Sequence, residues 1–141
     1  MIVNQVSELT IVDVLNRAVP NRECIALSAE ESVNLGQFGI MLGLYSPQNG
    51  AIPFLDHLFW FGNGFIKRGD WLFVYTGSGT PVTTKGSDGF SKVYSIYWGK
   101  PNTVFANTNI VPILFRVDAV NLFPPPENVA QLGKGGLIQQ L

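Results

Sequence analysis

The stretch Trp71-Leu72-Phe73-Val74-Tyr75 is the clearest strand signal in the chain, and it points to the class of fold. Its side chains are aromatic or aliphatic, and aromatic and β-branched residues are enriched in strands. The turn pair Gly69-Asp70 precedes this stretch, and Thr76-Gly77-Ser78-Gly79-Thr80-Pro81 follows it. An apolar run of five residues between two turns is typical of a β-strand.

Similar apolar runs stand on both sides of this stretch. Ser46-Pro47-Gln48-Asn49-Gly50 predicts a tight hairpin turn, because Asn-Gly tolerates the positive φ angles that such turns need. Pro112 predicts an edge position or a bulge, since proline cannot donate a hydrogen bond to a sheet. This spacing, without an amphipathic helix, predicts an all-β sandwich or barrel. We expect further strands within residues 10–15, 24–27, 38–42, 92–98 and 110–120.

The chain is expected to form one domain with a tail. A length of 141 residues suits a single hydrophobic core. We assign residues 1–123 to the β-sandwich and residues 124–141 to a tail that begins with Pro124-Pro125-Pro126. Three prolines favour an extended polyproline conformation. The rest of the tail is Gly-rich with an apolar tip, so we expect it to be flexible and able to dock on a neighbouring subunit.

The composition indicates association with protein. Charged residues make up 13% of the chain, against roughly 25% in typical soluble domains. Nine Lys and Arg against ten Asp and Glu give a net charge of −1 without a charged cluster, which argues against a nucleic-acid partner. A weakly charged surface associates readily. We therefore expect a protein partner, in a homo-oligomer or a larger assembly.

Residues suited to catalysis or to metal binding are scarce. His57 is the only histidine, and the neighbouring Asp56 would point to the opposite face of a strand, where it could not orient the imidazole. Cys24 is the only cysteine and is expected to be a small buried side chain. Gly77-Ser78-Gly79-Thr80 lacks the lysine and the helix of a phosphate-binding loop. Arg68-Gly69-Asp70 matches a cell-adhesion triplet but is interpreted as a turn. We predict no catalytic residues, no metal and no cofactor.

The N-terminal residues and the apolar runs predict where in the cell the protein is found. Met1 to Gln5 has neither a basic start nor a continuous apolar segment, so we expect no signal peptide and a cytoplasmic protein. Apolar runs fall short of the roughly 18 residues of a membrane span.

The aromatic residues suggest where a partner binds. Phe59, Trp60 and Phe61 are consecutive, so in a strand they cannot all face one interior. Trp60 is the leading candidate for an interfacial anchor, because Trp is favoured at binding hot spots. The predicted interface therefore comprises Phe59, Trp60, Phe61 and Trp98.

The order of motifs resembles the lamin-tail domain of bacterial type. Glu23-Cys24-Ile25-Ala26-Leu27 is similar to the Glu-x-hydrophobic-x-Leu strand of that family. The stretch from Arg68 to Gly79 is similar to its Gly-Asp turn and its strand ending in Tyr-Thr-Gly-x-Gly, and Tyr97-Trp98-Gly99 to its later Tyr-Trp-Gly. The resemblance implies an immunoglobulin-like antiparallel β-sandwich without catalytic residues, used for protein contacts or attachment.

Three functions are consistent with these observations. The leading hypothesis is a non-enzymatic protein–protein interaction or assembly module that associates with itself. A second is a PUA-like β-barrel that binds a nucleic acid or nucleotide. It would need Lys67, Arg68, Lys92 and Lys100 to converge on one groove beside an exposed aromatic residue. A third is a structural subunit of a phage-like particle, suggested by the low charge and the tail.

Overall fold

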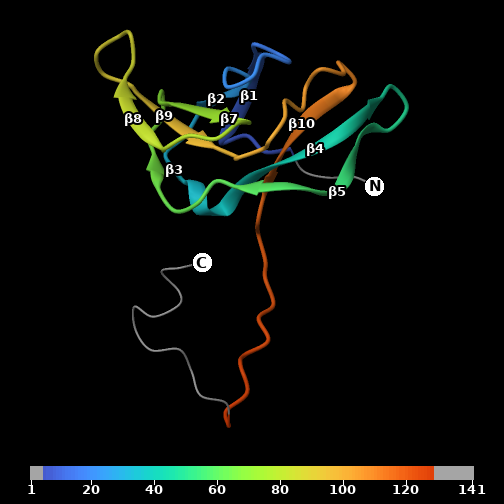
Figure 1. The fold of residues 1–141 in the computed structure, drawn as a ribbon. Coiled ribbons are helices and arrows are strands. Elements are labelled where there is room, and N and C mark those ends of the chain that lie inside the picture. Colours follow the sequence, from blue (N-terminus) through green and yellow to red (C-terminus); the bar gives the residue numbers. More distant parts are fainter. Residues whose placement is uncertain (1–4, 129–141) are drawn as a thin grey trace.

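The protein is a two-layered all-β structure, described by a computed structural model for residues 5–128 (Figure 1). This confirms the predicted all-β sandwich. Two larger sheets and a small two-stranded one make up the body. The elements are β1 (Leu9–Leu15), β2 (Cys24–Ala29), β3 (Val33–Asn34), the 3₁₀ turn η1 (Leu35–Gln37), β4 (Phe38–Ser46), β5 (Gly50–Trp60), β6 (Phe65–Ile66), β7 (Trp71–Tyr75), β8 (Val82–Lys85), β9 (Lys92–Tyr97) and β10 (Ile110–Arg116).

The larger sheet has the order β1-β2-β7-β9-β8. Its pairs are antiparallel except for β7 and β9, which run parallel. This differs from the wholly antiparallel sandwich that the family resemblance implies. After β7 the chain passes the position of β9, forms β8 at the edge, and returns as β9 between them. Gly79 lies on this crossing, where an added Cβ would collide with the ring of Tyr97.

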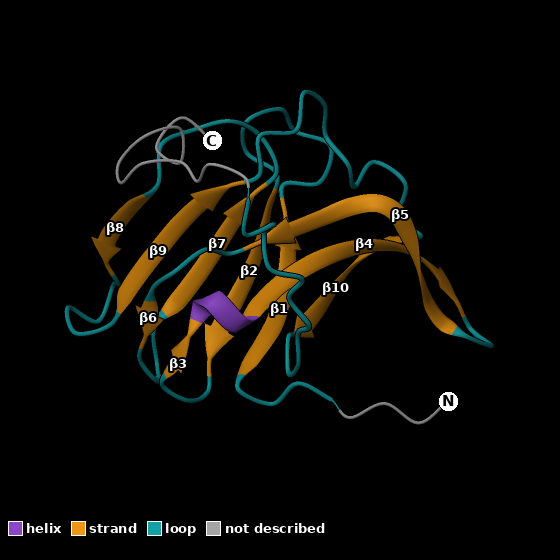
Figure 2. Ribbon diagram, turned by 90° about the horizontal axis from the view of Figure 1, so that it is seen from below, coloured by secondary structure: helices purple, strands orange, loops and turns teal. Residues whose placement is uncertain are grey.

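The second sheet has the order β10-β4-β5, and its strands are antiparallel. The predicted turn joins β4 to β5, and Gly50 has a φ of 74°, as a tight hairpin requires. β10 is an edge strand, which confirms the interpretation of Pro112. Figure 2 shows the β4–β5 hairpin curving away from the rest of the body.

Two features of the strands differ from those expected. β8 is a strand that the sequence did not predict, because all four of its residues are exposed and give no apolar pattern. The last strand ends at Arg116, short of residue 120, because Arg116 pairs with Phe38, the first residue of β4. Residues 117–128 continue as extended chain and turn (Figure 1). The rest of the predicted tail, residues 129–141, lies outside the described residues.

The hydrophobic core lies between the two larger sheets. Ile25, Leu27 and Leu72 come from the larger sheet, and Phe38 and Ile40 come from the three-stranded one. All five are fully buried. Alternation places these side chains on the inner faces, so each sheet retains an outer face whose composition the core does not decide.

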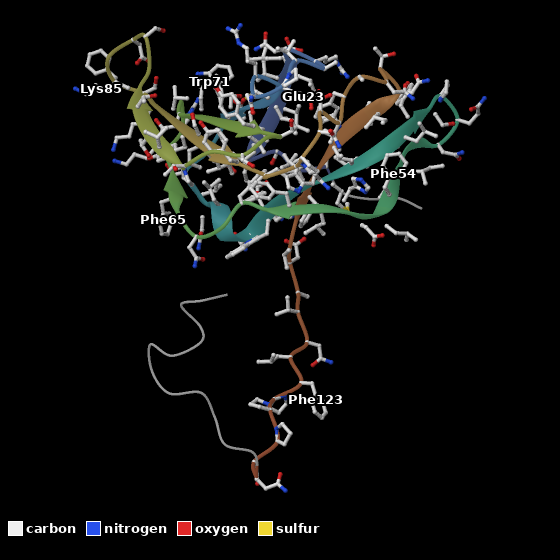
Figure 3. All side chains as sticks on the ribbon, in the orientation of Figure 1. Glu23, Phe54, Phe65, Trp71, Lys85 and Phe123 are labelled. Carbon is white, nitrogen blue, oxygen red and sulfur yellow. The ribbon has the colours of Figure 1, made fainter. Side chains whose placement is uncertain are left out.

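A buried carboxylate, that of Glu23, closes one end of the sandwich. It accepts hydrogen bonds from the Thr76 hydroxyl at 2.8 Å and from the backbone N–H of Ala18, Val104 and Phe105 at 2.8, 2.7 and 3.0 Å. These donors belong to three segments far apart in the sequence. The side chain is 1% exposed, so the hydrogen bonds compensate for the lost hydration of the carboxylate. Figure 3 shows Glu23 within the upper end of the body.

We predict that Glu23→Ala lowers the free energy of unfolding by about 3–5 kcal/mol, because it leaves several buried hydrogen-bond donors without an acceptor. Urea denaturation followed by tryptophan fluorescence measures the change. Glu31→Ala, at an exposed position, is the control and should change stability by less than about 0.5 kcal/mol. Equal effects of the two variants would contradict this role of Glu23.

Candidate functional site

The outer face of the three-stranded sheet is a continuous apolar surface. Residues paired across antiparallel strands share a face, so the register defines its members. Leu58, Tyr45 and Trp60 are 57%, 52% and 49% exposed. Because these side chains share one face, they form a larger contiguous apolar patch than scattered single residues would. We call this surface the outer sheet face, and it comprises Met41, Tyr45, Leu58, Trp60, Val111, Ile113 and Phe115.

Two glycines of β4 shape this face. A Cβ on Gly39 would collide with the ring of Phe115, and a Cβ on Gly43 would lie 2.6 Å from Cδ1 of Ile113. The missing side chains therefore let Phe115 and Ile113 lie across the sheet rather than stand upright from it. The result is a flat apolar surface over β10 and β4.

An enlarged bulge in β5 borders the outer sheet face. Leu58 pairs with Met41 and Pro53 with Gly43, so four residues of β5, residues 54–57, stand opposite one residue of β4. Leu55 in this bulge is 100% exposed. Figure 3 shows Phe54 on the outward-curving hairpin. A bulge bends a strand and interrupts its hydrogen bonding, so this edge is a poor template for adding another strand.

Of the four residues of the predicted interface, the structure brings Phe59, Phe61 and Trp98 together against the core and places Trp60 on the opposite side of β5. Trp60 lies on the outer sheet face, and its indole Nε1 donates a hydrogen bond to the Gly36 carbonyl at 2.8 Å. Phe59 points inward and stacks on Trp98, with ring centroids 5.5 Å apart. Phe61 is 7% exposed and belongs to the core. Trp60 is thus the one of the four that offers an accessible apolar surface.

The sequence also carries a signal for Ile113 and Phe115, which the predicted interface did not include. Ile113-Leu114-Phe115 is another run of three consecutive apolar residues within a strand, so its members also cannot share one side. Leu114 packs on the core, whereas Ile113 and Phe115 lie outside.

His57 lies in the β5 bulge beside an aromatic ring. Its ring centroid is 5.6 Å from that of Phe54, and its Nδ1 is buried without a hydrogen-bond partner in the described part of the chain. Asp56 is exposed. An imidazole that acts as a general base needs a group to orient it and a nucleophile within reach, and the hydrogen bonds found in residues 5–128 supply neither to His57.

A hollow of about 460 Å³ lies on the outer face of the larger sheet. Trp71 and Phe73 line it and meet edge to face, with ring centroids 6.2 Å apart. The loop of residues 86–91 forms its rim, and Asp88 braces this loop by accepting hydrogen bonds from the N–H groups of Phe90 and Ser91 at 2.8 Å. These hydrogen bonds lower the pKa of Asp88. The hollow combines an aromatic floor with a carboxylate at its margin.

The basic residues that a nucleic-acid site would need lie at two ends of the sheet. The backbone N–H groups of Lys67 and Lys92 both donate to Asp70, which immediately precedes β7. Lys100 lies beyond the other end of β7, where its N–H donates to the Thr76 carbonyl and its Nζ lies 5.1 Å from the Trp98 ring centroid. Lys67 and Lys92 therefore do not share one groove with Lys100.

Two kinds of feature are absent from residues 5–128. Within them, groups of three or more His, Cys, Asp or Glu arranged to hold a metal ion are not found. In the same part of the chain, helices of the length and apolarity needed to cross a membrane do not occur.

Cys24 is buried, as the sequence predicts. Loss of hydration raises the pKa of its thiol to about 12, despite an opposing hydrogen bond from the Val74 backbone. The nucleophilic species of cysteine is the thiolate, which is then scarce at neutral pH.

We predict that Cys24 reacts with Ellman's reagent at pH 8 only after the chain is unfolded in denaturant. Burial excludes the reagent, and the raised pKa keeps the thiol protonated. Absorbance at the reagent's product band measures the reaction in buffer and in denaturant. Full reaction of the folded chain within minutes would contradict this description of Cys24.

Comparison with known proteins gives no relative: no protein-family model, curated protein or solved structure matches the chain.

Proposed function

We propose that this protein is a non-enzymatic assembly module that associates with further copies of itself through the outer sheet face. The observation that carries the proposal is that the residues of this face are all uncharged and form a continuous apolar surface. A second copy is the occupant it suits best. Two such faces meet without like-charge repulsion, and a two-fold arrangement makes one patch complementary to itself.

The energetics favour a partner over solvent. Burial of one large apolar side chain contributes about 1.5–3 kcal/mol, and association costs an estimated 4–15 kcal/mol in lost freedom. Leu58, Tyr45 and Trp60 are each about half exposed. A two-fold contact buries these three side chains from both copies. The gain is sufficient to offset an association cost in the lower part of that range. Trp60 is also rigidly held by its hydrogen bond to Gly36, so it loses little freedom on binding.

The resemblance to the lamin-tail domain implies the same kind of function and stays a prediction. So does a role as a subunit of a phage-like particle, which would be a special case of self-association. The PUA-like hypothesis is less well supported, because Lys100 lies at the opposite end of the sheet from Lys67 and Lys92.

We predict that Leu58→Lys raises the dissociation constant of self-association about 100-fold or more. In a two-fold contact each of the two copies loses one buried leucine side chain. Light scattering of the full chain over a wide concentration range measures the mass. Lysine is tolerated on edge strands, so the fold should persist.

Val82→Lys is the matched control for this variant. Val82 is 50% exposed and also lies on an edge strand, but in the other sheet. Its substitution should leave self-association unchanged. A chain that remains monomeric at millimolar concentration, or equal effects of the two substitutions, would contradict the proposed function.

We also predict that self-association changes little between low and high salt, because the outer sheet face is uncharged. Contacts to phosphates weaken steeply with salt. Saturable binding of a single-stranded RNA oligonucleotide that disappears at high salt would favour the PUA-like hypothesis instead.

A further inference from the structure

A groove of about 690 Å³ lies where β1 and the segment before it approach β10 and the start of β5. Its lining is uncharged and mostly apolar. Within residues 5–128, both β1 and β10 are edge strands, so each has one side to which no other described strand pairs. The groove therefore offers apolar side chains and a strand edge in the same place. It is lined by Gln5, Val6, Leu9, Thr10, Ile11, Ala51, Ile113 and Leu114.

The two edges of the groove differ in their capacity to pair with another strand. Pro112 lies in β10 and has no N–H to donate. On β1, residues 9–11 pair regularly with β2, and the register shift comes only after Ile11. An incoming extended segment would thus find its hydrogen-bonding partners on β1 and its apolar contacts on both strands.

The segment that follows β10 has the properties of such a strand. Figure 1 shows it leaving the body of the sandwich as an extended chain. Val120, Leu122 and Phe123 are 84%, 82% and 91% exposed. Val120 and Leu122 are two residues apart, so in an extended chain they point to the same side. We call residues 117–123 the arm; it is as long as β1, which has seven residues.

The root of the arm is held in place by ion pairs and a hydrogen bond. Arg116 contacts Glu8 and Asp118 at 2.7 Å each. The Val117 N–H donates to the Gln37 carbonyl at 2.7 Å. The side-chain hydrogen bond from Arg116 lowers the pKa of Glu8, so the Arg116–Glu8 pair stays charged into mildly acidic solution. These contacts fix the start of the arm, which then leaves the body of the sandwich (Figure 1).

We propose that the arm of one copy adds as a strand to the free edge of β1 in a second copy, with Val120 and Leu122 in the groove between β1 and β10. The inference rests on the proposed function, because it concerns self-association. Strand addition of this kind combines main-chain hydrogen bonds with pockets for alternate side chains. Pro124-Pro125-Pro126 ends the pairing, since prolines cannot continue the ladder.

The charges of the two partners are compatible. Between Val117 and Pro126, Asp118 is the only charged residue, and Arg116 already neutralises it. The groove is lined by uncharged residues. Contact between an arm and a groove on different copies gives a closed dimer if it is reciprocal and a ring or chain if it runs head to tail.

A fluorescent peptide of residues 117–126 tests the proposal on the full chain. The chain carries Val120→Asp and Leu122→Asp, so that its own arm cannot compete for the groove. We expect saturable binding, seen as a rise in fluorescence anisotropy, with a dissociation constant of about 1 mM or below. Adding Thr10→Glu, which places a carboxylate in the groove lining, should weaken binding at least tenfold, by the free-energy equivalent of about 1.4 kcal/mol.

Thr84→Glu is the matched control, because Thr84 is an exposed threonine on the edge strand β8 of the same sheet. It should leave peptide binding unchanged. A lack of binding at 1 mM peptide, or equal binding to the Thr10→Glu and Thr84→Glu chains, would overturn the arm proposal. Light scattering of the chain with the natural arm separates the two proposals: if it self-associates while the peptide fails to bind, only the arm proposal falls.

Discussion

Much of the architecture depends on the hydrogen bonds that the buried Glu23 carboxylate accepts. Its two oxygens receive four hydrogen bonds, and the donors come from the β1–β2 turn, the end of β7 and the loop before β10. Ala18, one of the donors, has a φ of 62°, which is unfavourable for a residue with a side chain. A buried carboxylate that loses its partners is costly, so the three segments are held together as one unit. Phe105, another of the donors, is fully buried.

Asp70 has a comparable role at the opposite end of the larger sheet. It accepts from the backbone N–H of Lys67 and Lys92, both at 2.9 Å, and so joins the turn before β7 to the start of β9. This contact accompanies the unusual parallel pairing of β7 and β9. Buried carboxylates thus fix both ends of the larger sheet, whereas the exposed apolar surfaces described above lie on the three-stranded sheet, the arm and the groove. These are also the parts to which we assign association.

The two proposals share Ile113, which borders both surfaces, but otherwise involve different parts of the molecule and different physical forces. The outer sheet face offers flat apolar area, which drives association without much directional preference. The arm and the groove offer a strand and a strand edge, which fix orientation through main-chain hydrogen bonds. A protein with both can combine affinity from the sheet face with a defined geometry from the arm.

The amino-acid sequence alone determined the strands and turns that depend on residues close together in the chain. The runs 71–75 and 92–97, the Asn49-Gly50 turn, the edge position of Pro112 and the burial of Cys24 all follow from local residue types. The sequence also indicated that Phe59, Trp60 and Phe61 could not share one side. It could not show β8, whose exposed residues carry no apolar pattern.

Only the tertiary structure decided which apolar residues became core and which became surface. Val111, Ile113 and Phe115 are as apolar as the buried residues, but they lie on the side of β10 that faces away from the larger sheet. The partners of Glu23 lie up to 82 residues away in the sequence, so no local pattern could identify them. The physical reason is that alternation defines two sides of each strand, whereas the packing of one sheet on another selects the side that is buried.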